Sequence, residues 1–151
     1  IRGVNREVEE FYAQRVPLKE GVRQYIEEFR ERGVPMAIAT TGDRKNAEAA
    51  LKRLNVLRFF QGVFTCSEIG SSKNEPDIYY AAALQLDTEP GQTWVFEDAL
   101  HAIRTAKQAG FRTVGVYDKA NDRDLAHIWN TADIYLPEFK DFGMFWRRAS
   151  E

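Results

Sequence analysis

Apolar and polar residues follow one another in blocks that switch between helical and strand-like spacing. Segment 20–32 repeats its apolar residues at the spacing of a one-sided helix, whereas 34–39 is a short apolar run typical of a buried strand. The same reasoning predicts helices over 43–54, 76–86, 99–110, 122–130 and 139–148, and strands over 62–66, 93–96, 112–116 and 134–136. The end of a further helix is predicted over 8–14, and a loop over 67–75.

Strands that alternate with helices predict an α/β fold. Each strand–helix–strand connection is expected to be a right-handed crossover, so the strands lie mostly parallel and helices cover both faces of the sheet. An α+β domain would need adjacent strands joined by hairpin turns, and no such pair is present. The expected architecture is therefore a Rossmann-like three-layer sandwich.

Composition narrows the functions that such a domain can have. The chain has 151 residues, 44% of them hydrophobic and 29% charged, with 21 basic and 23 acidic residues. A net charge of −2 gives no electrostatic reason to expect binding to nucleic acid or to an anionic membrane. No apolar run approaches the length of a membrane span. The single cysteine, Cys66, excludes an internal disulfide and fits a reducing compartment, so we expect a cytoplasmic protein.

Residues with phosphate and metal chemistry follow three successive predicted strands. Thr40 and Thr41 follow the first, Lys73 lies in the loop after the second, and Glu97 and Asp98 follow the third. In a parallel sheet these positions share one edge, where α/β folds bind their ligands. Hydroxyls and an ammonium group hold phosphate, and carboxylates hold Mg²⁺. Together they suit stabilisation of a transferring phosphoryl group.

Each candidate residue also has a purely structural interpretation. Thr40 and Thr41 are compatible with a simple turn, and Lys73 with a solvated loop lysine. Glu97 and Asp98 are equally compatible with capping of the helix that follows them. The order of the three groups along the chain is what favours a shared site over three unrelated structural roles.

Taken together, four segments resemble the haloacid dehalogenase superfamily, in its branch of β-phosphoglucomutase-like phosphatases and mutases. The resemblance extends from about residue 16 to residue 116. It rests on segments 36–41 (MAIATT), 73–79 (KNEPDIY), 95–99 (VFEDA) and 106–111 (AKQAGF). Any one of these segments would be a weak signal, and their common order makes it specific.

The resemblance implies a role for each candidate residue. Thr40 is similar to the family's hydroxyl that hydrogen-bonds the transferring phosphoryl group, and Thr41 to an additional phosphate contact. Lys73 is similar to the lysine that neutralises the nucleophile and the phosphate. Glu97 and Asp98 resemble the acidic pair that binds Mg²⁺. Two local departures, Asn74 directly after the lysine and Ala99 directly after the acidic pair, remove no charged group.

A larger departure concerns the nucleophile. The family attacks phosphorus with the first aspartate of an Asp-x-Asp motif near the N-terminus, but no aspartate precedes Thr40 here. The one Asp-x-Asp, which begins at Asp122, opens a predicted helix and is interpreted as helix-capping acids. We therefore expect 1–15 to be a residual cap helix with its linker, and 16–151 to be an incomplete core domain without its first strand. Unpaired strand edges should result.

The leading hypothesis is a Mg²⁺-dependent phosphatase of small phosphomonoesters, such as sugar phosphates, that acts through an aspartyl-phosphate in a longer parent protein. The chain alone is expected to be inactive, because covalent catalysis needs the nucleophile. A phosphomutase and a non-catalytic protein that binds phosphate or metal remain open alternatives. A phosphate-receiving regulatory domain is disfavoured, since its acidic pair would come early in the chain. The oligomeric state is left open.

Overall fold

The computed structural model describes residues 6–9 and 18–151. Its strands are β1 (Arg6–Glu9), β2 (Met36–Thr40), β3 (Val63–Thr65), β4 (Thr93–Glu97), β5 (Arg112–Val116) and β6 (Ile134–Leu136). Its α-helices are α1 (Val22–Glu31), α2 (Arg44–Arg53), α3 (Cys66–Ile69), α4 (Asp77–Leu86), α5 (Leu100–Gln108), α6 (Leu125–Thr131) and α7 (Phe142–Ala149). Short 3₁₀ turns span Leu57–Phe59, Pro90–Gln92 and Lys119–Asp124.

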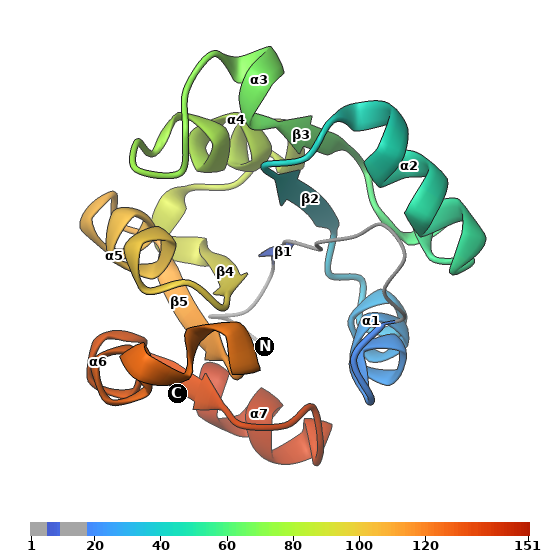
Figure 1. Ribbon diagram of the computed structural model, residues 1–151. Coiled ribbons are helices and arrows are strands. Elements are labelled where there is room, and N and C mark those ends of the chain that lie inside the picture. The colour runs from blue at the N-terminus through green and yellow to red at the C-terminus, as the bar shows by residue number, and fades with distance from the viewer. Residues whose placement is uncertain (1–5, 10–17) are drawn as a thin grey trace.

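The six described strands form one parallel sheet in the order β3-β2-β1-β4-β5-β6. Helices cover both faces of this sheet, as Figure 1 shows in a view that surrounds the strands with helices. The predicted α/β class and the three-layer arrangement are confirmed. No helix among residues 6–9 and 18–151 has the length and apolar character needed to cross a membrane.

Alternation along the central strands explains the two hydrophobic layers. In β2, Met36 and Ile38 join the core formed with α1, α2 and α7, whereas Ala37 joins the core formed with α4 and α5. In β4, Trp94 and Phe96 point to the first core and Val95 to the second. Because both faces are buried, these strands consist almost entirely of apolar residues, as expected for a central parallel sheet.

Small residues let the helices of the second layer lie close to the sheet. Ala82 on α4 and Ala106 on α5 are fully buried there. The first layer is instead filled by aromatic rings from α1 and α7, among them Phe29, Phe142 and Phe145. The aromatic residues of the C-terminal segment thus belong to the core: Phe139, Phe142, Phe145 and Trp146 are all buried.

The sequence prediction was wrong at the start of the chain. Residues Arg6–Glu9 form strand β1 between β2 and β4, not the end of a helix, so the described sheet has no gap at that position. Helical spacing in a short polar segment was outweighed by pairing with two neighbouring strands. Residues 10–14 of the predicted helix lie outside the described residues. The boundary between 1–15 and 16–151 stays a prediction.

Other differences are local. The segment predicted as a loop after β3 begins with the short helix α3, whose first turn Thr65 caps by accepting a hydrogen bond from the Glu68 amide at 3.2 Å. The predicted helix 122–130 divides into a 3₁₀ segment and α6, with a non-helical residue at Asn121. Asp124 stands at the N-cap position of α6 without a side-chain capping bond, so the capping interpretation fails for this residue.

Gly21 fixes the approach of α1 to the segment before α7. Its φ of +89° is left-handed, and a Cβ there would lie 1.9 Å from the carbonyl oxygen of Phe139. We expect Gly21→Ala to lower the free energy of unfolding by about 3 kcal/mol, combining left-handed strain with a steric clash.

Gly33→Ala is the matched control for this measurement by urea denaturation. Gly33 has φ +74° with nothing within 4 Å of an added Cβ. Gly33→Ala should therefore lower the free energy of unfolding by only the cost of the left-handed conformation, about 1 kcal/mol. Equal losses in the two variants would contradict the close contact between Gly21 and Phe139.

Candidate active site at the carboxyl edge of the sheet

The candidate residues meet where the direction of the chain through the sheet reverses. From β1 the chain proceeds to β2 on one side, whereas β4 pairs with the other side of β1. Such a switch point at the carboxyl ends of parallel strands is where open α/β sheets bind ligands. Thr40 is the last residue of β2 and Glu97 the last of β4. The last paired residue of β1 is Glu9, which is opposite Ile38 of β2 and Phe96 of β4. Thr40 and Glu97 therefore lie beyond the end of the pairing with β1.

A buried lysine connects the two strands at this point. Lys73 Nζ donates to the Ala39 carbonyl oxygen of β2 at 3.0 Å and to Glu97 Oε2 of β4 at 2.6 Å. The two charged side chains are only 2% and 1% exposed. Tyr79 on α4 donates its hydroxyl to the same Glu97 oxygen at 2.7 Å. Lys73 is therefore not a solvated loop lysine, and its ammonium group has a fixed place at the switch point.

Glu97 does not cap the helix that follows. The N-cap position of α5 is Ala99, which makes no side-chain capping bond, and Glu97 instead accepts from Lys73 and Tyr79. In this arrangement one oxygen of Glu97 orients the lysine.

Thr40 and Thr41 behave differently although they are adjacent. The Thr40 side chain is buried, and its hydroxyl oxygen accepts a hydrogen bond from the Gly42 amide at 3.0 Å. Thr41 is exposed in the loop that leads to α2. This bond is of the kind found in turns, so Thr40 does have the turn role that the sequence allowed. The same bond orients the Thr40 hydroxyl at the end of β2.

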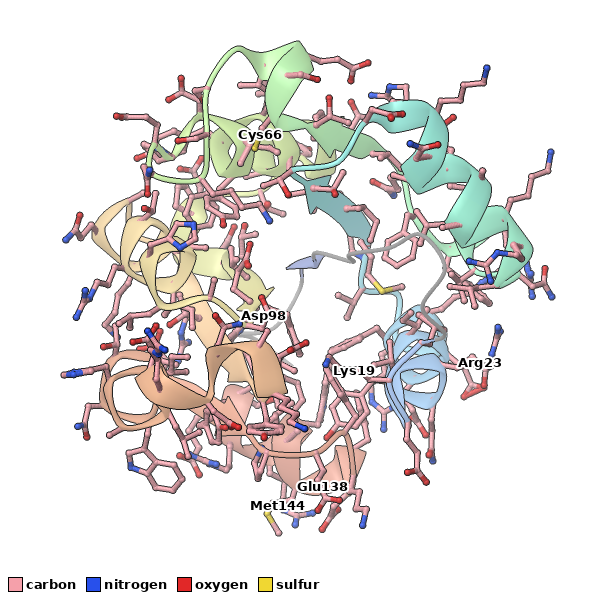
Figure 2. All side chains as sticks on the ribbon, in the orientation of Figure 1. Lys19, Arg23, Cys66, Asp98, Glu138 and Met144 are labelled. Atoms are coloured by element: carbon pink, nitrogen blue, oxygen red, sulfur yellow. The ribbon has the colours of Figure 1, made fainter. Side chains whose placement is uncertain are left out.

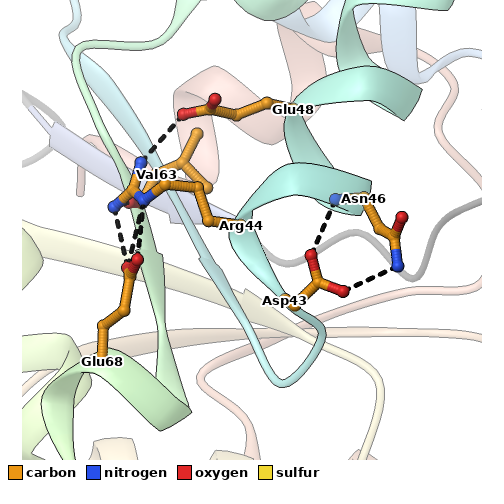
Figure 3. A network of polar contacts seen from close by, with 6 residues as sticks. All are labelled: Asp43, Arg44, Asn46, Glu48, Val63 and Glu68. Atoms are coloured by element: carbon orange, nitrogen blue, oxygen red, sulfur yellow. Dashed lines mark hydrogen bonds and ion pairs between the residues drawn. The ribbon is translucent and has the colours of Figure 1, made fainter.

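The loop after β2 is held by a polar network, drawn in Figure 3. Asp43 caps α2 by accepting from the Asn46 amide at 2.9 Å. Arg44 donates to Glu68 at 3.0 and 3.1 Å, to Glu48 at 2.8 Å, and to the Val63 carbonyl oxygen. Hydrogen bonding from Arg44 holds the pKa of Glu68 below its ordinary value. These contacts tie α2 to β3 and α3, next to the loop that follows Thr40.

A second carboxylate, which was not among the predicted site residues, lies next to Asp98. Asp118, just past the end of β5, lies close enough to Asp98 for that side chain to contribute to lowering the pKa of Asp118. Asp118 also accepts from Lys19 Nζ at 2.8 Å and from the Ala120 amide at 2.9 Å. Partial burial acts to raise the pKa of Asp118, but Lys19, the Ala120 amide and Asp98 together hold it below its usual range.

Lys19 and Asp98 both lie toward the middle of Figure 2, with the helices around them. A signal for Asp118 was present in the sequence, because it follows a predicted strand as Asp98 does. Nothing in the sequence distinguished Lys19 or Tyr79, and Tyr79 was hidden within an apolar helix face.

The donor set suits the Mg²⁺ that the family resemblance implies. Mg²⁺ is commonly held by one or two carboxylates together with substrate phosphate and water. Asp98 and the adjacent Asp118 are carboxylates of this kind, whereas one oxygen of Glu97 is engaged by Lys73 and Tyr79. Among residues 6–9 and 18–151, no group of three or more acidic, cysteine or histidine side chains is arranged to hold a metal ion. The described residues thus bring together fewer than three such side chains at this place.

Comparison with known proteins gives the family. The model of the haloacid dehalogenase-like hydrolases matches residues 2–110, and the chain belongs to this family. It is 31% identical over 122 residues to a validoxylamine A 7'-phosphate phosphatase of Streptomyces hygroscopicus, covering 81% of this chain and 55% of that protein. It is 28% identical over 120 residues to a phosphorylated carbohydrates phosphatase of Thermotoga maritima, covering 79% of this chain and 56% of that protein.

Among solved structures, CbbY from Rhodobacter sphaeroides in complex with phosphate superimposes with a TM-score of 0.75 at 28% identity. The alignment covers 84% of this chain and 56% of that chain. The chain thus spans about half the length of the curated relatives it matches. The predicted resemblance to the family is confirmed.

The buried ion pair leads to a stability prediction. Lys73→Met should lower the free energy of unfolding by about 3–5 kcal/mol, because it leaves the Glu97 carboxylate buried without its counter-charge. Lys107→Met is the matched control. Lys107 pairs with Asp133 at 2.8 Å but is 43% exposed, and loss of such a pair should cost about 1 kcal/mol or less.

Urea denaturation of both variants, with a double variant that adds Glu97→Gln to Lys73→Met, measures the coupling. The double variant should recover part of the loss, since the unpaired charge is gone. Additive losses would show that Lys73 and Glu97 do not stabilise one another.

Proposed function

We propose that this chain is the core domain of a Mg²⁺-dependent phosphatase that hydrolyses phosphomonoesters of small, carbohydrate-like metabolites. The observation that carries the proposal is the buried Lys73 ammonium group, held between the ends of β2 and β4 by Ala39 and Glu97. Lysine is almost never fully buried unless it is paired, and this paired lysine lies at the edge where such sheets bind ligands. The names of the two phosphatase relatives support the substrate class.

Each side chain has a role in this proposal. The Thr40 hydroxyl hydrogen-bonds a phosphoryl oxygen, with Thr41 as a further contact from the exposed loop. Lys73 neutralises negative charge on the phosphoryl group, and Glu97 orients it. Asp98, with Glu97 beside it, belongs to the acidic pair assigned to Mg²⁺. Bound Mg²⁺ supplies positive charge to the phosphoryl oxygens.

Binding of Mg²⁺ and inorganic phosphate to the chain tests these roles. Thr40→Ala should weaken phosphate binding about tenfold, because a hydrogen bond to a charged group contributes about 1.5–3 kcal/mol. Asp98→Asn should abolish most Mg²⁺ binding, because it removes a carboxylate from the metal site. Isothermal titration calorimetry measures both affinities.

Two matched variants serve as controls for these titrations. Thr131→Ala removes a hydroxyl that donates to the His127 carbonyl oxygen on α6, and Asp87→Asn changes an exposed acid at the end of α4. Both should bind phosphate and Mg²⁺ like the original chain. Unchanged affinities in Thr40→Ala and Asp98→Asn would contradict the phosphate and Mg²⁺ roles assigned to these two residues.

Turnover provides an independent test. The aspartate nucleophile that the family resemblance implies has no counterpart before Thr40 in these 151 residues. We therefore expect the isolated chain to bind phosphate without hydrolysing p-nitrophenyl phosphate, as covalent catalysis requires the nucleophile. Hydrolysis by the pure chain that disappears in Asp98→Asn would refute this part of the proposal.

A further inference from the structure

An exposed tryptophan lies on α6, away from the residues discussed so far. Trp129 is 63% exposed, whereas Trp94 and Trp146 are buried. Helix α6 packs against α5 and β6 at one end of the sheet (Figure 1). A single exposed apolar side chain is ordinary on a protein surface, so the surroundings of Trp129 decide whether the ring has a role.

Both buried tryptophans carry an arginine over the ring. The guanidinium carbon of Arg112 lies 4.3 Å from the centre of the Trp94 ring, and that of Arg32 lies 5.1 Å from the centre of the Trp146 ring. These contacts are cation–π interactions, for which tryptophan is the best of the aromatic side chains. No cation from the described part of the chain lies over Trp129. The exposed indole is therefore available to a cation from outside.

A second aromatic ring stands beside Trp129. The centres of the Trp129 and Tyr135 rings are 5.6 Å apart and their planes meet at 52°, so the two rings form a corner and not a stack. Tyr135 in β6 pairs with Gly115 in β5. A Cβ at Gly115 would lie 3.3 Å from the Tyr135 ring and 2.8 Å from Ile128 of α6, so the missing side chain lets both pack closely against β5. The corner is thus formed before any ligand arrives, which reduces the entropy lost on binding.

A carboxylate lies near this corner. Asp122 is close enough to Tyr117 and Tyr135 to raise the pKa of both hydroxyls. Hydrogen bonding to Asp122 is the largest cause for Tyr117, and burial, followed by the charge of Asp122, is the cause for Tyr135. Asp122 forms no ion pair with a basic side chain among residues 6–9 and 18–151. Its negative charge is therefore not neutralised by a neighbour.

Two ring faces and one carboxylate favour an organic cation as the ligand. An anion would be repelled by Asp122, and a purely apolar group would remove water from the carboxylate without replacing it. A primary ammonium group is strongly hydrated, so it gains little by moving onto an aromatic ring. A quaternary ammonium group carries its charge on methyl groups that fit against aromatic rings, and aromatic cages recognise such groups.

We propose that Trp129, Tyr135 and Asp122 form a binding site for a quaternary ammonium group. The group is carried either by a small choline-like molecule or by a trimethylated lysine side chain of another protein. A solvent-facing site with two rings and one carboxylate is expected to bind in the millimolar range. The inference does not rest on the proposed phosphatase function, because it uses none of Thr40, Lys73 and Asp98.

An NMR titration of the full chain with choline chloride tests the proposal, with sodium chloride at the same ionic strength as the reference. Choline should shift the indole N–H of Trp129 and the amide of Tyr135, and should leave the indoles of Trp94 and Trp146 unchanged. The neutral carbon analogue of choline, in which a tert-butyl group replaces trimethylammonium, should bind about fivefold more weakly or worse, because it lacks the charge.

A second probe distinguishes the two sources of the ligand. Acetylated trimethyl-lysine amide carries the same quaternary group on a lysine side chain, so it should shift the same Trp129 and Tyr135 signals. Tighter binding of this probe than of choline would indicate a modified protein as the source. Tighter binding of choline would indicate a small molecule.

Variants assign the binding to individual side chains. Trp129→Leu keeps an apolar side chain without the ring and should weaken choline binding about fivefold, whereas Trp129→Phe should restore most of the affinity. Asp122→Asn should weaken binding about twofold, and this loss should become smaller at high salt. The matched controls are Tyr80→Leu, which removes an exposed ring from α4, and Asp87→Asn, which changes an exposed acid at the end of α4. Neither control should alter choline binding.

Four results would overturn the proposal. The first is the absence of a Trp129 shift with choline, and the second is equal affinity for choline and its carbon analogue, which would identify a merely apolar surface. The third is unchanged choline affinity in Trp129→Leu. The fourth is a Trp129 shift that follows protein concentration alone, which would show that a second copy of the chain covers the ring. None of these results would change the phosphate titrations at Thr40, so the proposed function is tested separately.

Discussion

The buried ion pair between Lys73 and Glu97 is the constraint on which the site depends. Two opposite charges that are almost wholly excluded from water are stable only when each satisfies the other with good geometry. Meeting this condition fixes the loop that carries Lys73 against the end of β4. The bond from Lys73 to Ala39 extends the same constraint to the end of β2. Thr40 and Asp98 then occupy defined positions on either side.

The sheet makes this arrangement possible. Parallel strands end at a common edge, and the order of the strands reverses at β1, so residues far apart in the chain converge there. Apolar residues on both faces of β2 and β4 leave no freedom to shift the register, because a one-residue slip would exchange the two core layers. Because the core fixes the register of β2 and β4, it also fixes the positions of the residues at their carboxyl ends.

Much of the fold was predictable because periodicity reports burial directly. The run 34–39 and the acidic pair after 93–96 led to β2, β4 and the edge that bears Thr40, Glu97 and Asp98. Strand β1 was missed since its four residues carry little pattern of their own, and pairing on both sides decides its conformation. Helix α3 was not predicted for a similar reason, because a single capped turn is too short to show a helical periodicity.

The sequence by itself determined the α/β class, the order of the elements and the residue types that phosphate chemistry requires. These follow from local spacing and from where each strand must end. Only the tertiary structure decided which partners those residues take: Tyr79 and Lys73 for Glu97, and Asp118 for Asp98. Such contacts join residues on different elements, and their distances depend on how the helices pack against the sheet, which no local pattern encodes.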